Sequence, residues 1–330
     1  MADITTMTSS GSGASSVSRL RALQLAEMPL AKELLRVCQA HGIRVFADGG
    51  TLLGAVRHKG FIPWDDDMDF AMLREDFDKF LKIGPQAFKP PYFFQTAETD
   101  RDFFASFAVL RLDGTTLLWT YDAAEPTYHC GVKIDIFPLD TIPQREREAE
   151  RLMKDVFTIR RILGALDHLG GETTNPVKLR IKHAVMPVIR KLIGGRAGGW
   201  RKLQAICRAS NAKNRDSELI SYITFFLGRA KWVPYQREWY AQTVLLPFED
   251  ILLPSPVGYE EVCRTLYGTD YMTPTMTSGH SPEFMDLEHS YAELKAMGMP
   301  IPRDGSQGFS NWMQTNQTSV ASQPEGEAAR

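Results

Sequence analysis

The chain has 330 residues, of which 43% are hydrophobic and 24% are charged, and its formal net charge is −2. This composition predicts a soluble globular protein with one sizeable domain or two small ones, and the small net charge excludes a global field that attracts nucleic acid. The cysteines show no Cys-x-x-Cys spacing, which is typical of reduced thiols in a cytoplasmic protein. They are Cys38, Cys130, Cys207 and Cys263.

The N-terminal part is expected to be a disordered tail followed by a helix. Residues 1–17 are rich in Ser, Gly and Thr and lack the basic and apolar regions of a secretory signal. No run approaches the roughly 18 apolar residues of a spanning helix. Apolar residues recur at helical spacing from Leu20 to Gln39, with Gly42 as a stop, and a β-rich run follows at 43–47.

A glycine pair interrupts this β-rich run. Gly49 and Gly50 permit a positive φ and a close approach of the backbone to a ligand, and Thr51 is a reasonable cap for a short helix over 52–56. A helix N-terminus favours an anion such as a phosphate group. The alternative is an ordinary turn between a strand and a helix.

Acidic residues are concentrated shortly after this helix. Asp65, Asp67 and Asp69 alternate in an extended chain, so they are predicted to share one face of a strand, where mutual repulsion favours a divalent cation. An EF-hand calcium loop is excluded, because its sixth and twelfth positions require Gly and Glu and here hold Phe70 and Asp76. The remaining alternative is a solvated acidic turn. The large apolar neighbours Trp64, Met68 and Phe70 argue against it, because they imply a packed environment.

Basic residues lie between the glycines and the acids. Arg57 and Lys59 suit phosphate contacts, although they could also offset the dipole at a helix end. His58 is expected to be an exposed or packed histidine rather than a general base. Farther along, Arg111 could reach a phosphate group or lie on the surface.

The rest of the chain predicts further helices and strands. Helices are expected at 74–82, 144–170 and 256–266, strands at 92–95, 104–111 and 131–140, and a loop at 251–256. Residues 173–215 contain no Asp or Glu but eleven Lys or Arg, together with apolar residues. This basic segment suits an anionic membrane surface, or else has a basic face in water, and its glycine pairs at 194–195 and 198–199 are expected to break it.

The stretch from Asp48 to Asp69 resembles the signature of LicD-type phosphotransferases, which are relatives of the fukutin proteins in the polymerase-β-type nucleotidyltransferase superfamily. Gly131 to Asp140 resembles the second motif of that family, and supportive matches follow at 247–256, at 266–272 and at His280. The resemblance covers about residues 25 to 290. Met68 is a mild departure, since the family usually has a β-branched residue at that position.

The resemblance implies an α/β (α+β) fold with a nucleotidyltransferase-type mixed sheet core at 18–145. A mostly helical region at 146–300 would complete the domain, between disordered tails at 1–17 and 301–330. Asp67, Asp69 and Asp135 would be the catalytic carboxylates and would hold Mg²⁺ (or Mn²⁺), with Asp65 as a further candidate. Gly49, Gly50, Thr51, Arg57 and Lys59 would bind the substrate.

The implied activity is the transfer of a phospho-alcohol, such as phosphocholine, from a CDP-activated donor to a hydroxyl of a cell-surface glycan or glycolipid. Lipopolysaccharide or capsule biosynthesis would be the setting, and no nucleic acid would be involved. The enzyme would be cytoplasmic, with a peripheral membrane contact through residues 173–215. Two alternatives stay open, namely a nucleotidyltransferase that moves NMP to an acceptor and a non-catalytic nucleotide-binding relative. The alcohol, the acceptor, the general base and the oligomeric state are not assigned.

Overall fold

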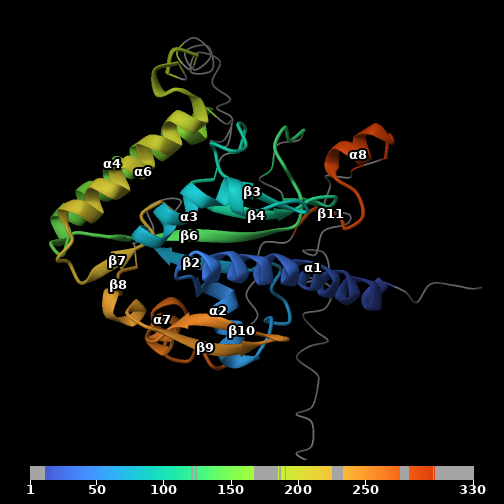
Figure 1. The fold of residues 1–330 in the computed structure, drawn as a ribbon, viewed down its shortest axis with the longest axis horizontal. Coiled ribbons are helices and arrows are strands. Elements are labelled where there is room, and N and C mark those ends of the chain that lie inside the picture. Colours follow the sequence, from blue (N-terminus) through green and yellow to red (C-terminus); the bar gives the residue numbers. More distant parts are fainter. Residues whose placement is uncertain are drawn as a thin grey trace, which may run out of the picture.

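The computed structural model describes residues 12–103, 105–119, 122, 125–166, 185, 187–189, 191–224, 233–275, 282–299 and 301. Predictions for residues 1–11, for 173–184, for His280 and for 302–330 lie outside these ranges. The described chain forms a mixed sheet with helices on both sides (Figure 1), which confirms the predicted α/β class.

The central sheet has seven strands in the described part of the chain, and its main path runs β1-β2-β6-β4-β3. Strands β2 and β6 are parallel, whereas the other pairs are antiparallel, and β7 joins the far end of β6 and pairs with β8. The strands are β1 (Phe46–Ala47), β2 (Asp69–Leu73), β3 (Tyr92–Gln95), β4 (Ala108–Leu112), β6 (Lys133–Thr141), β7 (Leu219–Ser221) and β8 (Tyr235–Gln236).

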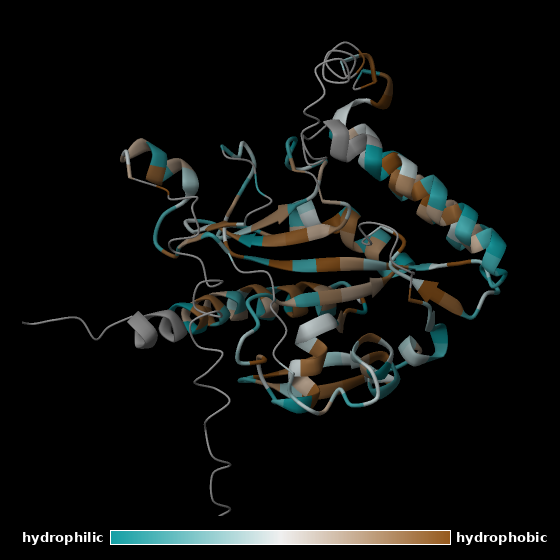
Figure 2. Ribbon diagram, turned by 180° about the vertical axis from the view of Figure 1, so that it is seen from behind, coloured by the Kyte–Doolittle hydropathy of each residue, from teal (hydrophilic) through white to brown (hydrophobic). Residues whose placement is uncertain are grey.

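Strand β6 is the centre of the core. All of its residues are buried, including the polar Lys133 and Asp135. The reason is that helices cover both faces of the sheet: α1 (Ser12–Ala40) runs along one face and α3 (Arg74–Ala87) along the other (Figure 1). The apolar colouring of the strands in Figure 2 fits this arrangement. A strand covered on both sides buries its charged residues as well as its aliphatic ones, so these charges need partners.

A helical pair packs at one end of the sheet. It consists of α4 (Glu146–Leu166) and α6 (Gly195–Lys213), and α6 also contacts β6. Trp200, Leu203 and Cys207 of α6 are buried. The apolar side of the basic segment is therefore turned into the protein along α6. Gly194 and Gly195 interrupt the segment, as predicted, because α6 begins there, whereas Gly198 and Gly199 lie within the helix.

A second group of elements packs beneath β1. It contains α2 (Gly49–Arg57), a 3-10 helix η1 (Arg237–Tyr240), the hairpin β9 (Thr243–Phe248) and β10 (Ile251–Pro256), and α7 (Tyr259–Tyr267). The loop prediction for 251–256 is wrong, because β10 pairs with β9 along its whole length. Prolines are tolerated here since the hairpin is a separate two-stranded sheet with open edges.

A third, smaller group lies beside β4. Strand β5 (Thr116–Leu118) pairs with β11 (Phe284–Asp286), and α8 (Tyr291–Ala296) begins with a capping box of Ser290 and Glu293. The region after residue 145 thus carries strands as well as helices. Among the described residues no helix combines the length and the apolar character that crossing a membrane requires.

Several predicted boundaries shift. The helix at 20–39 is confirmed and is longer, since α1 begins at Ser12, within the tail predicted at 1–17. The strand at 43–47 shortens to β1. The helix at 74–82 continues through Pro85 to Ala87, and the strand at 104–111 begins only at Ala108. The predicted strands at 92–95 and 131–140 are confirmed as β3 and β6.

Candidate cation and phosphate site

The turn between β1 and α2 holds the glycine pair against the acidic strand. The Asp48 N–H donates to the Asp69 carbonyl oxygen at 3.0 Å, and Gly49 has a φ of +50°, a conformation that favours glycine. Thr51 does not cap the helix, because α2 begins at Gly49 with Asp48 at its N-cap position. Instead the Thr51 hydroxyl oxygen accepts a hydrogen bond of 2.8 Å from the Asp69 N–H, which ties α2 to β2.

Both glycines are in close contact with carboxylates. A Cβ atom at Gly49 would lie 2.9 Å from Asp69 Oδ2, and one at Gly50 would lie 2.2 Å from Asp65 Oδ2. Any side chain at these positions would displace an acid. The N-terminal turn of α2 therefore faces Asp65 and Asp69 directly.

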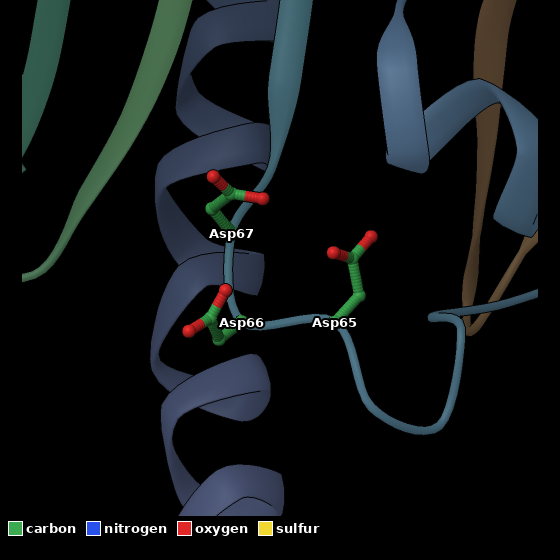
Figure 3. A group of neighbouring side chains, drawn as sticks. All are labelled: Asp65, Asp66 and Asp67. Atoms are coloured by element: carbon green, nitrogen blue, oxygen red, sulfur yellow. The ribbon is translucent and has the colours of Figure 1, made fainter. Parts of the chain in front are cut away.

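The acidic residues do not all belong to a strand. Strand β2 begins at Asp69, so 65–68 form a loop and the predicted alternation of Asp65 and Asp67 on one strand face is not what the structure has. Asp65, Asp66 and Asp67 instead converge, with carboxylate oxygens within 4.8 Å of one another. Figure 3 shows Asp66 and Asp67 beside α1, and Asp65 extending toward α2. Asp66, which the sequence analysis did not select, joins the cluster because a loop need not alternate.

The parallel pairing of β2 and β6 brings in the third predicted carboxylate. Asp69 lies opposite Asp135 in the register, so both side chains emerge on the same face of the sheet. Asp135 Oδ2 accepts a bond of 2.5 Å from Lys133 Nζ, which lies 5.6 Å from the centre of the Trp119 ring. Asp135 Oδ1 is buried without a hydrogen-bond partner among the described residues.

Burial and mutual repulsion raise the pKa of several of these acids. Burial is the main cause for Asp65, Asp66 and Asp69, and the charge of Asp67 adds to it in each case. The charge of Asp135 raises the pKa of Asp69 further, whereas Lys133 lowers the pKa values of Asp66 and Asp69. In the absence of a cation, the folded chain therefore favours protonated carboxyl groups here.

Helix α1 borders the acidic loop on one side. Gln24 Nε2 donates to the Asp65 carbonyl oxygen at 2.9 Å and so holds the loop backbone. Glu27, one turn farther along, is fully buried, and neither of its carboxylate oxygens has a hydrogen-bond partner within the described part of the chain. Sequence reasoning missed both residues. Their signal was a polar pair at i, i+3 inside an otherwise apolar helix face.

Asp48 lies in a buried pocket of tyrosines behind the glycines. Its Oδ2 accepts a hydrogen bond of 2.5 Å from the Tyr222 hydroxyl, and its charge also raises the pKa values of Tyr235 and Tyr240. Burial raises the pKa of Asp48 to about 6, although hydrogen bonds from Tyr222 and from the Gly49 backbone oppose the shift. Asp48 thus holds the entry to α2 rather than adding to the acidic cluster.

The basic residues are not brought together with the acids. Arg57 is at the opposite end of α2, about 12 Å along the helix from Gly49. Its Nη1 donates to the Tyr271 carbonyl oxygen at 2.8 Å. Lys59 is exposed, with a φ of +57°. The geometry therefore does not place either residue in a phosphate cradle at the helix N-terminus.

Two further predictions have plain outcomes. Arg111 is not a surface residue: it is buried and donates to Gln95 and to the Gly131 carbonyl oxygen, at 2.5 and 2.7 Å. His58 is a packed histidine, as expected, with its ring against Trp64.

The chemistry of the donor set fits a hard divalent cation. Carboxylate oxygens come from the loop 65–67, where they lie within 4.8 Å of one another, and from Asp69 and Asp135, which lie opposite each other on β2 and β6. Buried oxygens without a partner among the described residues, Asp66 Oδ2 and Asp135 Oδ1, would gain one in such an ion. A solvated acidic turn does not describe this loop, because Met68 and Phe70 beside it are fully buried.

Comparison with known proteins shows what the segment that carries this site is similar to. Residues 42–143, which include β1 to β6, match the model of the LicD/FKTN/FKRP nucleotidyltransferase domain. The lipopolysaccharide cholinephosphotransferase LicD of Haemophilus influenzae is 40% identical over 79 residues, which are 24% of this chain and 30% of that protein. The human ribitol 5-phosphate transferase FKRP is 46% identical over 46 residues, 14% of this chain and 9% of that protein. The chain thus spans less than a third of the length of either relative.

Proposed function

We propose that this chain, which belongs to the LicD family through its residues 42–143, transfers a phospho-alcohol from a CDP-activated donor to a hydroxyl group of a glycan or glycolipid. The observation that carries the proposal is the parallel register of β2 and β6, which sets Asp69 beside Asp135 next to the carboxylates of 65–67. The names of the two relatives, a cholinephosphotransferase and a ribitol 5-phosphate transferase, support the transfer of a phospho-alcohol.

Asp67, Asp69 and Asp135 would hold Mg²⁺ or Mn²⁺, with Asp65 and Asp66 beside them. When bound, the cation would neutralise phosphate charge and lower the pKa of the acceptor hydroxyl group. Thr51 keeps β2 in place through its bond to the Asp69 N–H, and Gln24 keeps the loop in place through the Asp65 carbonyl oxygen. Such positioning would supply much of the rate acceleration in phosphoryl transfer.

The N-terminus of α2 is our candidate for the contact with the donor diphosphate. Gly49 and Gly50 are half-buried and carry no side chain beside Asp69 and Asp65, so a donor held at these acids would lie close to the helix backbone. The ammonium group of Lys133 also lies at this end of the site, where it donates a hydrogen bond to Asp135. Arg57 and Lys59 stay outside this contact, since they lie at and beyond the far end of α2.

The proposed reaction makes a bond between the acceptor oxygen and the phosphorus that carries the alcohol. The bond from that phosphorus to the oxygen of CMP breaks, CMP leaves, and the acceptor loses its proton. Nucleotidyl transfer would instead attack the other phosphorus, leave CMP on the acceptor and release the alcohol phosphate. Product analysis by mass spectrometry separates the two reactions, because they put different groups on the acceptor.

The first test measures thermal unfolding of the full chain with Mg²⁺ and each of CDP-choline, CDP-ethanolamine, CDP-glycerol and CDP-ribitol. One donor at a hundredfold excess over its dissociation constant should stabilise the fold by about 2.7 kcal/mol. The double variant Asp67→Asn/Asp69→Asn should lose this shift, and the exposed control Asp216→Ala/Asp250→Ala should keep it. If no CDP-alcohol stabilises the wild type, the proposed donor is wrong.

We also propose that the protein is cytoplasmic and contacts the inner face of a membrane through its basic segment. Because α6 buries its apolar side, the contact narrows to the exposed Val185, Val188 and Leu192 beside Lys191. Anionic liposomes should then co-sediment the protein at low salt and release it at high salt. Equal recovery with neutral liposomes at high salt would remove this part of the proposal.

A further inference from the structure

Glu27 is a buried acid that the proposed site does not yet use. Its side chain is fully buried in α1, and both carboxylate oxygens are without a hydrogen-bond partner among the described residues. An ionised carboxylate in such a place is costly, so a stable fold normally gives it a partner or a cation. The other buried acids with an unpartnered oxygen among the described residues, Asp48, Asp66 and Asp135, have one such oxygen each.

Its position explains what the partner could be. The charges that act on Glu27 are those of Asp67, Asp66 and Asp65, which repel its ionised form, and that of Lys133, which attracts it. Gln24, one turn before it on α1, already contacts the backbone of the acidic loop. Glu27 therefore lies against the α1 side of the 65–67 cluster, where Asp66 also has a buried oxygen, Oδ2, without a partner among the described residues.

We propose that Glu27 is a further carboxylate of the cation site and that, with Asp66, it binds a divalent cation from the α1 side of the acidic loop. Three buried oxygens, both of Glu27 and Oδ2 of Asp66, are without a hydrogen-bond partner among the described residues and would gain one in such an ion. Carboxylate oxygens are the ligands that Mg²⁺ and Mn²⁺ prefer. The inference rests on the metal requirement of the proposed function and adds a residue from a helix outside the matched segment 42–143.

The test measures Mn²⁺ binding by the full chain without any substrate. The electron paramagnetic resonance signal of the unbound ion reports how much Mn²⁺ remains free. Glu27→Gln should weaken Mn²⁺ binding at least tenfold. The matched control is Glu33→Gln on the same helix, where the carboxylate pairs with Arg36 at the surface, and it should bind Mn²⁺ like the wild type. Because Glu27 and Asp66 would act on one ion, the double variant with Asp66→Asn should lose less than the product of the two single losses.

A second readout separates a ligand from a structural residue. In chelator, Glu27→Gln and Glu27→Met should unfold at the wild-type temperature or above it, since each removes a buried carboxyl group that has no hydrogen-bond partner among the described residues. Added Mn²⁺ should then stabilise the wild type more than either variant. If Glu27→Gln binds Mn²⁺ as tightly as the wild type, or if either variant is less stable than the wild type in chelator, only the role of Glu27 is overturned. Absence of Mn²⁺ binding by the wild type would overturn the metal requirement as well.

Discussion

Gly50 provides the sharpest test of how the glycine pair serves the site. Its φ is outside the left-handed region, so alanine fits the backbone and would even favour the helix by up to about 1 kcal/mol. The new Cβ atom, however, would lie 2.2 Å from Asp65 Oδ2. The carboxylate must retreat by about 1 Å, and a displacement of this size can cost about 100-fold in rate. We therefore expect Gly50→Ala to lose about 100-fold in transfer while its stability stays within about 1 kcal/mol of the wild type.

Gly54, in the same helix, should behave in the opposite way. A Cβ atom there would lie 2.5 Å from the backbone carbonyl oxygen of Gly60, which cannot move as a side chain can. Gly54→Ala should lose about 1 to 3 kcal/mol of stability from overpacking. The assays are urea unfolding for both variants and transfer from whichever CDP-alcohol stabilises the wild type. A fully active Gly50→Ala variant with normal Mn²⁺ affinity would refute the argument that the missing side chain positions Asp65.

Two further predictions concern stability. The Arg74 guanidinium donates to both oxygens of Asp140 at 2.6 and 2.8 Å, and both side chains are almost fully buried. Arg74→Met should lower the free energy of unfolding in urea by about 3 to 5 kcal/mol. Arg36→Met, which breaks a surface ion pair, should lower it by less than about 1 kcal/mol. Equal losses in the two variants would contradict the importance of the buried pair. The pKa of Asp48 is about 6 in the folded chain and 3.8 ordinarily, so this carboxyl group ionises at lower pH in the unfolded chain. Its ionisation should therefore lower the stability of the fold as pH rises from 3.8 to 6. In chelator, the free energy of unfolding of the wild type should fall by about 3 kcal/mol between pH 3.5 and 6.5 relative to that of Asp48→Asn. Asn is the control because its side-chain oxygen can still accept the hydrogen bond from Tyr222. Parallel pH profiles of the two proteins would show that Asp48 is not responsible.

The local sequence was sufficient for the elements that carry the site. A β-rich run, a glycine pair and a short helix predicted the turn that now presents α2 to the acids. The pattern in 131–140 predicted β6, because period-2 patterning is a local signal, and the family resemblance then singled out Asp135. The cation itself remains a prediction.

Long-range pairing decided the rest. Only the parallel register of β2 and β6 sets Asp69 opposite Asp135, and no local pattern encodes a pairing between strands about 65 residues apart. Likewise Arg57 looks like a phosphate ligand in the sequence, but the carbonyl groups of 271–273 bind it in the fold.

The acidic residues themselves divide in the same way. The sequence by itself determined that carboxylates are concentrated at 65–69, beside residues apolar enough to force them into the interior. The packing of a loop against a helix decided which of these carboxylates converge. The same packing brought Glu27 of α1 against them. Side-chain periodicity fixes a direction only within a regular element, so burial across elements is decided by the tertiary structure.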